Sequence, residues 1–356
     1  MDPAVLIPTA DTIPAHWSLF QLLLTSTTTL HLLAMNVMLG ISVIIFVSTV
    51  RANTVPAPEI KFIAGKLPPA IAITINFGVA PLLFLQVLYG QFIYTSSVLM
   101  AVYWLAVIPM LIAAYYLAYI FKYRQATMQL GRMAISGAVT LLFLIIAFIF
   151  TNNLTLMQRP DAWSDYATTK DGLMLNLGDP TLFPRYLHFV FSSLAIGGLA
   201  GALYHDYRKR RGAIDREEMI RKGVKWFIVC TVINTGFGFL FLGSLPKGLF
   251  HFSTLRDFFF VLFLIGGIGT ALSAMVLAAA RRVRPAALSI AASVFFMVID
   301  RELLRAAYLN PYFNPTDLTL APQYSPLFLF LLIFAGGVAL IIYMLKLVAR
   351  AEEVTE

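Results

Sequence analysis

The feature that most constrains this chain is a series of long apolar runs separated by short charged breaks. Nine runs lie at roughly 18–50, 69–97, 100–121, 133–157, 183–205, 224–244, 256–280, 285–308 and 325–348. A helix needs about 20 apolar residues to cross a hydrocarbon core of about 30 Å, and each run reaches that length. Strands of an outer-membrane barrel would alternate apolar and polar residues over about ten positions. We therefore expect an all-α, polytopic membrane helix bundle with about nine transmembrane helices.

Composition supports a single transmembrane domain over residues 1–356. The chain is 59% hydrophobic and only 12% charged, whereas ordinary soluble domains are about a quarter charged. Its net charge of +8 lies in the breaks between runs, so we expect membrane lipid and no nucleic acid as its surroundings. The single cysteine, Cys230, lies inside an apolar run; the chain therefore has no intrachain disulfide and no Cys-X-X-Cys-His attachment motif for c-type haem. The polar, acidic residues before Trp17 lack the basic start of a cleavable signal peptide.

The distribution of Lys and Arg predicts the orientation. With nine spans, the breaks at 51–68, 122–132, 206–225 and 281–284, together with the tail after 346, carry 19 of the 26 Lys and Arg residues. Positive residues mark the cytoplasmic side of short loops. We therefore place the N-terminus outside and the C-terminus in the cytoplasm. The basic run from Arg208 to Arg211 is part of this topology signal, with an anionic-lipid patch as the alternative.

Two of the outer loops are long. Segment 158–183 contains Trp163, Tyr166 and several acidic residues, and segment 309–326 is rich in proline and aromatic residues. These loops either form a surface for a partner or substrate, or are connectors with interfacial aromatic side chains.

Ionisable residues inside the membrane are costly and therefore point to function. Here the main candidates are histidines: His31 near the middle of the first run and His188 near the outer end of the fifth. A charged group lies toward the outer end of the eighth run, where its spacing allows internal Asp–Arg pairs: Asp300, Arg301, Glu302 and Arg305. No run carries a carboxylate at mid-depth, which disfavours a proton-coupled transporter. Phosphate-binding, metalloprotease and serine-hydrolase motifs are absent as well. Ligation of a b-type haem between helices is the leading chemistry that needs histidine and little else.

His188 is the strongest candidate ligand, because small residues that could admit a flat macrocycle follow it on the same helix: Ser192, Ser193, Ala195, Gly197, Gly198, Ala200 and Gly201. The alternative is that these residues serve helix–helix packing, a common use in membranes. His31 could be a ligand or a buried hydrogen-bonding group. In the second span Pro81 predicts a kink, and the neighbouring amides either hold helices together or line a quinone pocket.

Three segments resemble subunit I of the cytochrome bd quinol oxidase superfamily. The first is FQLLLTSTTTLHLLAMNVMLGISVIIF, which ends at Phe46; the second is Ile75-Asn76-Phe77 with Val79; the third is Phe183-Pro184-Arg185-Tyr186-Leu187-His188-Phe189-Val190 with Ser193, Gly197 and Gly201. They resemble the first, second and fifth helices of that family, and the predicted topology also matches. The resemblance covers helices 18–210, whereas helices 224–348 are diverged. It implies that His188 is an axial ligand of a low-spin b haem near the outer face, and that His31 corresponds to the ligand in the first helix.

The departures from the family bear on the reaction. The third run has none of the glutamates of the oxygen-reducing haem pair, and the long quinol-binding loop is reduced to about 245–256. The family's methionine ligand in the seventh helix is missing: Phe258 falls where it is expected if Arg256 matches the nearby arginine. His251 is then a candidate for the second axial ligand, since it also lies near the outer face. Met275 is about 17 residues deeper and is a weaker candidate.

We therefore expect a membrane subunit of a respiratory complex in the bacterial or archaeal cytoplasmic membrane. It would exchange electrons between quinone and an outer partner, such as a multihaem c-type cytochrome, through one or two b haems. As an enzyme it would be a quinol-oxidising or quinone-reducing oxidoreductase subunit and not an oxygen reductase. Arg185, Lys247 and Arg256 would be outer-side cations near the haem propionates or a quinone head group. The alternatives are a haem-free scaffold that docks partner proteins and, with less support, a small-molecule transporter.

Overall fold

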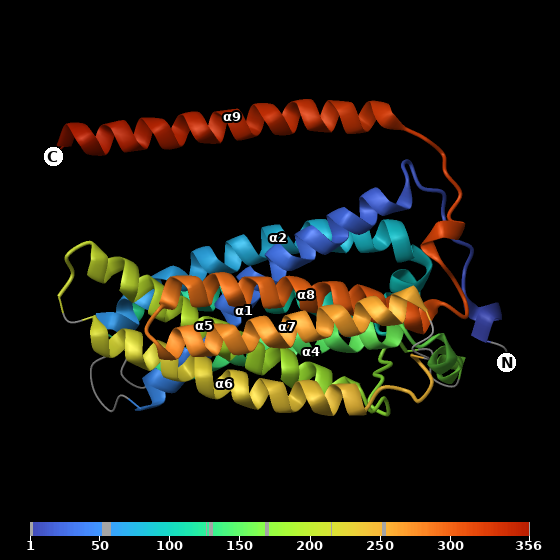
Figure 1. Cartoon of the computed structure of the whole chain (residues 1–356), viewed down its shortest axis with the longest axis horizontal. Helices are drawn as coiled ribbons and strands as arrows, with labels where there is room; N and C mark the ends of the chain where they lie inside the picture. The colour runs from blue at the N-terminus through green and yellow to red at the C-terminus, as the bar shows by residue number, and fades with distance from the viewer. Residues whose placement is uncertain are drawn as a thin grey trace.

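The chain is a bundle of long, roughly parallel and antiparallel helices (Figure 1). A computed structural model describes residues 3–51, 58–125, 127, 131–167, 171–214, 216–250 and 254–355. Its long helices are α1 (Trp17–Arg51), α2 (Pro58–Leu99), α3 (Ala101–Arg124), α4 (Gly131–Met157), α5 (Leu182–Arg210), α6 (Glu217–Gly243), α7 (Leu255–Ala279), α8 (Val283–Leu309) and α9 (Tyr324–Thr355). Short 3-10 helices lie at η1 (Pro3–Leu6), η2 (Pro160–Ala167) and η3 (Pro315–Asp317).

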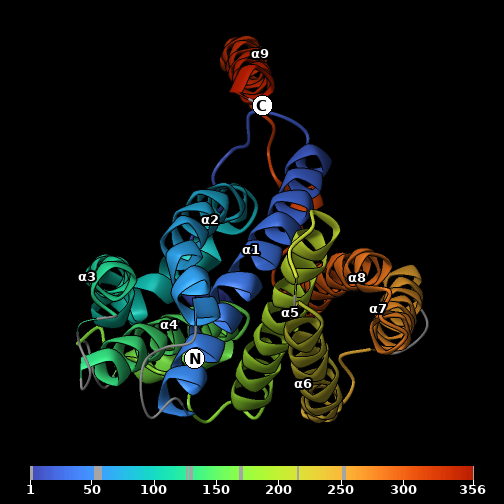
Figure 2. The ribbon, with the colours of Figure 1, turned by 90° about the vertical axis from the view of Figure 1, so that its left-hand side faces the viewer.

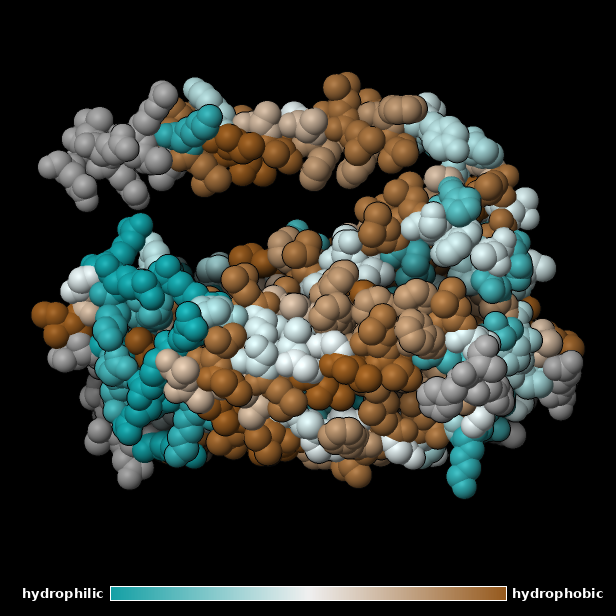
Figure 3. Space-filling view, viewed as in Figure 1, coloured by the Kyte–Doolittle hydropathy of each residue, from teal (hydrophilic) through white to brown (hydrophobic). Residues whose placement is uncertain are grey.

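The predicted membrane bundle is confirmed. Within the described ranges, nine helices are long and apolar enough to span a membrane, and each corresponds to one predicted run. The N- and C-termini lie at opposite ends (Figure 1), as an odd number of crossings requires. Hydrophilic residues gather at the end that holds the α5–α6 connection, and an apolar band covers the middle (Figure 3). We call the hydrophilic end the inner end, following the charge distribution.

The first eight spanning helices form two four-helix units. In the first unit (α1–α4), α1 packs against α2 and α4, and α3 packs against α4; in the second unit (α5–α8), α5 packs against α6 and α8, and α7 packs against α8. The units meet mainly along α1 and α5, with α8 also touching α1 and α4 touching α5. Figure 2 shows the units side by side, with α9 standing apart from both. The fold thus repeats one arrangement of helices.

Helix α2 has an irregular residue at a position that the sequence did not predict. Pro81 predicted a kink, but the residue with non-helical angles inside α2 is Tyr89 (φ −135°, ψ 32°). A proline removes one helical hydrogen bond and is tolerated in a membrane helix that its neighbours support. Tyr89 is buried, and its ring lies under the Arg305 guanidinium, with 5.2 Å from Cζ to the ring centroid. The irregular backbone therefore coincides with a contact to α8.

That contact belongs to a buried polar network at the outer end of the bundle. Arg305 is fully buried and forms an ion pair with Glu302, one turn earlier on α8. Gln21 of α1 donates a hydrogen bond to the same carboxylate at 3.3 Å. Breaking a buried ion pair by removing one partner leaves an uncompensated charge, so this network fixes α8 against α1 and α2.

The outer loops pack onto the bundle. Trp163 in η2 is buried, and its indole N–H donates to the Leu156 carbonyl oxygen at 2.9 Å. The N-terminal segment pairs with the α8–α9 connection: Ile13 N–H donates to Thr319 O, and Ala321 N–H donates to Ile13 O, each at 2.9 Å. These bonds tie the segments together over the outer end of the first unit.

Candidate functional site

A cavity of about 220 Å³ lies within the second unit. Its walls come mainly from α5, α6, α7 and α8, with small parts of α1 and of the outer end of α4, and most of the lining side chains are apolar. A single water needs about 10–15 Å³ by this kind of measure, so the space admits a large organic group. Apolar cavities with a few polar groups are the usual form of ligand sites.

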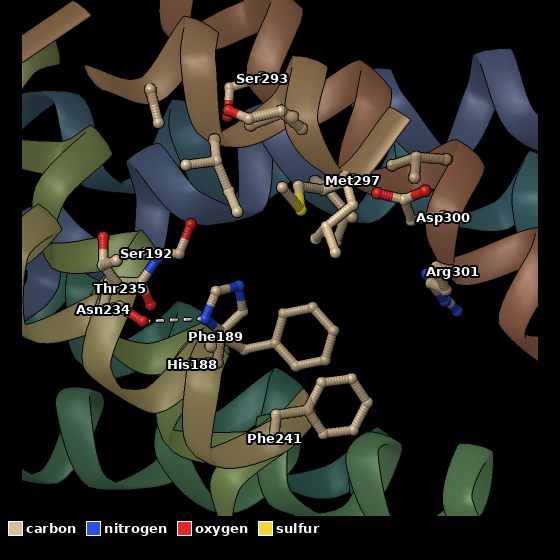
Figure 4. A pocket seen from close by; sticks show the side chains of 18 of the residues that line it. His188, Phe189, Ser192, Asn234, Thr235, Phe241, Ser293, Met297, Asp300 and Arg301 are labelled. Atoms are coloured by element: carbon tan, nitrogen blue, oxygen red, sulfur yellow. Dashed lines mark hydrogen bonds between the residues drawn. The ribbon is translucent and has the colours of Figure 1, made fainter. Parts of the chain in front are cut away.

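His188 of α5 projects into this cavity (Figure 4). Its Nδ1 lies 3.1 Å from the carbonyl oxygen of Asn234 on α6. A carbonyl oxygen only accepts hydrogen bonds, so Nδ1 carries the proton of the neutral ring. The Nε2 atom then keeps its lone pair, and it is directed into the cavity (Figure 4). An imidazole whose Nδ1 is bonded to a backbone carbonyl has the usual orientation of a metal-ligating histidine.

A glycine allows α6 to approach the imidazole closely. A Cβ atom built on Gly238 would lie 3.2 Å from His188 Cε1 and 3.3 Å from Nδ1. Gly238 is one turn along α6 from Asn234, so one helix face both binds and supports the ring. The orientation of the imidazole is therefore set by the backbone of α6.

Met297 of α8 lies on the opposite wall of the cavity, with its thioether sulfur directed toward the space in front of His188 (Figure 4). Its terminal methyl packs on Gly267 of α7, where an added Cβ would lie 2.3 Å from that carbon. Next to it, the Ser293 hydroxyl donates to the Gly267 carbonyl oxygen at 2.8 Å. These contacts fix the part of α8 that carries Met297.

Charged side chains gather at the outer end of the cavity. Arg185 and Arg301 both line it, and so does Asp300. Arg185 donates through Nη1 to the Gln158 side-chain oxygen at 3.1 Å, whereas its Nε and Nη2 atoms are buried without a hydrogen-bond partner among the described residues. Asp300 is 6% exposed, and neither of its carboxylate oxygens has a hydrogen-bond partner there. This end of the cavity therefore holds more charge than its own contacts neutralise.

His31 repeats the arrangement of His188 in the first unit. Its Nδ1 lies 3.1 Å from the Thr74 carbonyl oxygen of α2, and a Cβ on Gly78, one turn further along α2, would lie 2.8 Å from its Cε1. The neutral ring is thus held as the same tautomer, with Nε2 free. His31 does not line the cavity of the second unit, so the structure does not bring the two histidines into one site.

Contacts between α1 and α5 set the two histidines at the same level. The Ser193 hydroxyl donates to the Asn36 side-chain oxygen at 2.7 Å, and Gly40 packs so tightly on α5 that an added Cβ would lie 2.0 Å from Ser193 O. Asn36 is five residues after His31, and Ser193 is five residues after His188. Since the contact joins equivalent positions of both helices, the units are in register.

The sequence contains a signal for this repeat that is not apparent when each helix is considered alone. Leu-His followed by glycine nine residues after the histidine occurs at 30–40 and again at 187–197. The partner helices carry Thr-Ile-Asn-Phe-Gly at 74–78 and Asn-Thr-Gly-Phe-Gly at 234–238. In each pair, the first residue supplies the carbonyl that accepts from histidine, and the last is the glycine under the ring. A search for parallel repeats would have identified both histidine sites together.

Arg256 and Lys247, the other expected cations, do not line the cavity. Arg256 is at the start of α7, where its Nε lies 3.3 Å from the carboxylate of Asp257, and it is not among the cavity-lining residues. Lys247 is exposed in the α6–α7 connection. His251 lies outside the described residues. Met275, the weaker candidate for the second ligand, lines the cavity from α7.

The ligand set of the cavity fits a haem. A neutral imidazole with a free Nε2, a thioether facing it and guanidinium groups at one end are groups that bind haem iron and carboxylates. No cluster of three or more metal-binding side chains occurs among the described residues, so a bare metal ion has no comparable site there. Neither a scan against protein-family models nor a search of curated proteins finds a match to this chain.

Proposed function

We propose that this multi-pass membrane protein is the b-haem electron-transfer subunit of a respiratory complex. The observation that carries the proposal is the pair of anchored histidines, His31 and His188, each with Nδ1 on a backbone carbonyl and a glycine beneath the ring. A histidine that served only as a polar contact between helices would not need its second nitrogen directed into a cavity, as that of His188 is (Figure 4). When bound, haem supplies a one-electron couple between ferric and ferrous iron.

His188 would hold the haem in the second unit through Nε2, and Met297 would bind it from the opposite wall of the cavity. In this assignment Met297 of α8 takes the role that a methionine of the seventh helix has in the cytochrome bd superfamily. Methionine is a neutral, soft ligand that raises the reduction potential of haem relative to a second histidine. His31 is the proposed ligand of a second haem in the first unit.

We also propose a wider role for this subunit in a complex. The subunit would pass electrons between quinone in the membrane and a multihaem c-type cytochrome or another subunit at the outer face, in a bacterial or archaeal cytoplasmic membrane. His188 lies near the outer end of α5, which favours exchange on that side. Oxygen reduction is not part of the proposed function, because α3 contains no acidic residue.

A reduced-minus-oxidised absorbance spectrum of the purified full chain, with pyridine haemochrome quantification, tests the proposal. We expect a b-type signal with one or two haems per chain. A flat spectrum from protein that is monodisperse and helical by circular dichroism would contradict it. A chain lacking haem because of poor supply in the host is identified by adding haem to the purified protein and repeating the spectrum.

One observation favours a second candidate function, a haem-free scaffold. The spanning part of α9 (Tyr324–Leu347) is apolar yet has no buried residues, and the helix stands apart from both units (Figures 1 and 2). A helix of this kind could dock partner subunits in the membrane. The two candidates are separated by the same spectrum, because the scaffold would bind its partners with no Soret absorbance at all.

A further inference from the structure

The unexplained feature of the cavity is an excess of positive charge buried at its outer end. Arg185 and Arg301 lie close enough for their charges to interact, and both line the cavity. Two guanidinium groups buried in one place repel each other, and burying charge without compensation costs free energy. Neither guanidinium forms an ion pair among the described residues, so the partner of these two charges lies outside the chain's own contacts.

The nearest carboxylates do not provide that partner. Asp300 lines the same cavity, but no ion pair joins it to either arginine among the described residues, and both of its oxygens are without hydrogen bonds. Glu302 lies near Arg301 but is engaged by Arg305 and Gln21. Asp179 lies near Arg185 but is paired with Arg159 at 2.9 Å. Arg301 itself makes no hydrogen bond or ion pair within the described ranges. The Asp300 carboxylate and the Arg301 guanidinium point in different directions (Figure 4).

Arg185 is held in place with its remaining donors available. Its guanidinium stacks over the Phe241 ring, with 4.9 Å from Cζ to the centroid, and Nη1 binds Gln158. The Nε and Nη2 atoms are left without a partner. These adjacent donors form one edge of the guanidinium plane, which is the geometry that binds a carboxylate through two hydrogen bonds.

The two arginines are placed alike relative to the proposed ligands. Arg185 precedes His188 by three residues on α5, and Arg301 follows Met297 by four residues on α8, which runs in the opposite direction. At 1.5 Å of rise per residue, each lies roughly 5–6 Å nearer the outer end than the ligand on its own helix. Residues three or four apart share a helix face. Each wall of the cavity therefore carries one ligand and, about one turn outward, one guanidinium.

We propose that Arg185 and Arg301 bind the two propionate carboxylates of the haem held at His188, an assignment that rests on the proposed function. The two carboxylates compensate the two cations, and the donors of Arg185 gain acceptors. The edge of the haem that carries the propionates would then face the outer side of the membrane. An anionic lipid or a fatty acid could supply similar chemistry, so the test must distinguish the source.

The test compares protohaem with its dimethyl ester, in which both carboxylates are blocked. Each is titrated into the purified full chain, freed of haem, and binding is followed in the Soret band. A hydrogen bond to a charged group contributes roughly tenfold or more in affinity. We therefore expect protohaem to bind the unsubstituted chain roughly 100-fold more tightly than the diester, counting both arginines. Arg185→Gln and Arg301→Gln should each weaken protohaem about tenfold and leave diester binding nearly unchanged.

Controls separate failure of this inference from failure of the proposed function. Arg282→Gln, an exposed arginine at the inner end, should retain full discrimination. Equal binding of both haems to the unsubstituted chain, or an equal loss of both in the arginine variants, would overturn the propionate assignment alone and leave a lipid-derived anion as the partner. If neither haem binds to folded protein, both the assignment and the proposed function are overturned. Circular dichroism checks that each variant folds.

Discussion

The two four-helix units hold a histidine in the same way but differ in how tightly they close around it. In the first unit α2 packs against α4, whereas the equivalent helices of the second unit, α6 and α8, are not in comparable contact. The cavity lies where this contact is missing. Similar local geometry at His31 and His188 therefore occurs in different surroundings, and of the two imidazoles it is that of His188 that faces the described cavity.

The anchoring of a histidine and the size of the space in front of its ring are therefore separate properties. The anchoring depends on one carbonyl and one glycine on the neighbouring helix, so two short segments are enough to specify it. The space in front of the His188 ring depends on the separation of α6, α7 and α8. Substitutions in each unit can test whether this difference between them is also a difference in function.

The largest expected effect comes from removing each histidine in turn. His188→Ala should eliminate the low-spin b-haem signal of the second unit, because the ring that presents Nε2 is lost. His31→Ala should leave that signal in place and remove at most the second haem. Haem per chain from the pyridine haemochrome assay, together with the low-spin spectrum, measures both effects. If His31→Ala abolished the low-spin signal and His188→Ala did not, the roles of the two units would be reversed.

Substitution of the opposite wall tests the next contrast. Met297→Leu keeps the volume of the side chain but removes the thioether, so the haem at His188 should become high-spin and bind carbon monoxide. Met275→Leu, also in the cavity wall, is the matched control and should stay low-spin. Electron paramagnetic resonance of the oxidised protein distinguishes the two states. A low-spin Met297→Leu protein would exclude this residue as an axial ligand.

The glycines beneath the rings should show a smaller, graded effect. A Cβ at Gly78 would lie 2.8 Å from the His31 ring, and one at Gly238 would lie 3.2 Å from the His188 ring. Overpacking a tight contact costs about 1–3 kcal/mol, so Gly78→Ala should destabilise the protein more than Gly238→Ala does. The cavity also gives the His188 ring room to move. Thermal unfolding in detergent measures the order, and Gly65→Ala, where a Cβ meets nothing within 4 Å, is the control.

The smallest effect concerns pH at the outer surface, away from both histidines. Hydrogen bonds from Arg159 lower the pKa of the Asp161 carboxyl. Because the folded-state pKa lies below the unfolded one, the stabilisation is present at neutral pH and is lost as the pH falls through the lowered pKa. Exposed ion pairs contribute about 0–1 kcal/mol, so the change should be slight. Asp161→Asn should flatten this part of the thermal stability profile at acidic pH and leave the haem spectrum unchanged.

Several elements were predictable because the membrane restricts what a chain can do. Nine apolar runs long enough to cross a bilayer can satisfy their backbone hydrogen bonds only as helices, and the structure has a helix over each. His188 could be singled out because a histidine is costly in an apolar helix and needs a reason to be there. The position of Arg185 on the outer side of it followed from their spacing along one helix.

Other parts of the site could not be predicted from single helices. Met297, Asp300 and Arg301 lie on α8, more than 100 residues after His188, and nothing along the chain shows that α8 faces α5. Pro81 predicts a kink in α2, but no residue of that segment predicts the non-helical angles of Tyr89, whose ring Arg305 covers. The repeat can be detected in the sequence at residues 30–40 and 187–197. Its role in anchoring the histidines becomes clear only from the structure, which shows which carbonyls accept from the two imidazoles.

The amino-acid pattern alone indicates the class of this protein: a helical membrane bundle, with nine spanning helices in the described ranges and a histidine placed where histidine is costly. It does so because hydrocarbon tolerates only helices with their own hydrogen bonds satisfied, and the lengths of the apolar runs record this directly. That His31 and His188 occupy equivalent positions, and that just one of them faces the described cavity, emerges from the packing of the helices. That outcome depends on close helix contacts at glycines such as Gly40 and on the distance between α6 and α8, which no single segment encodes.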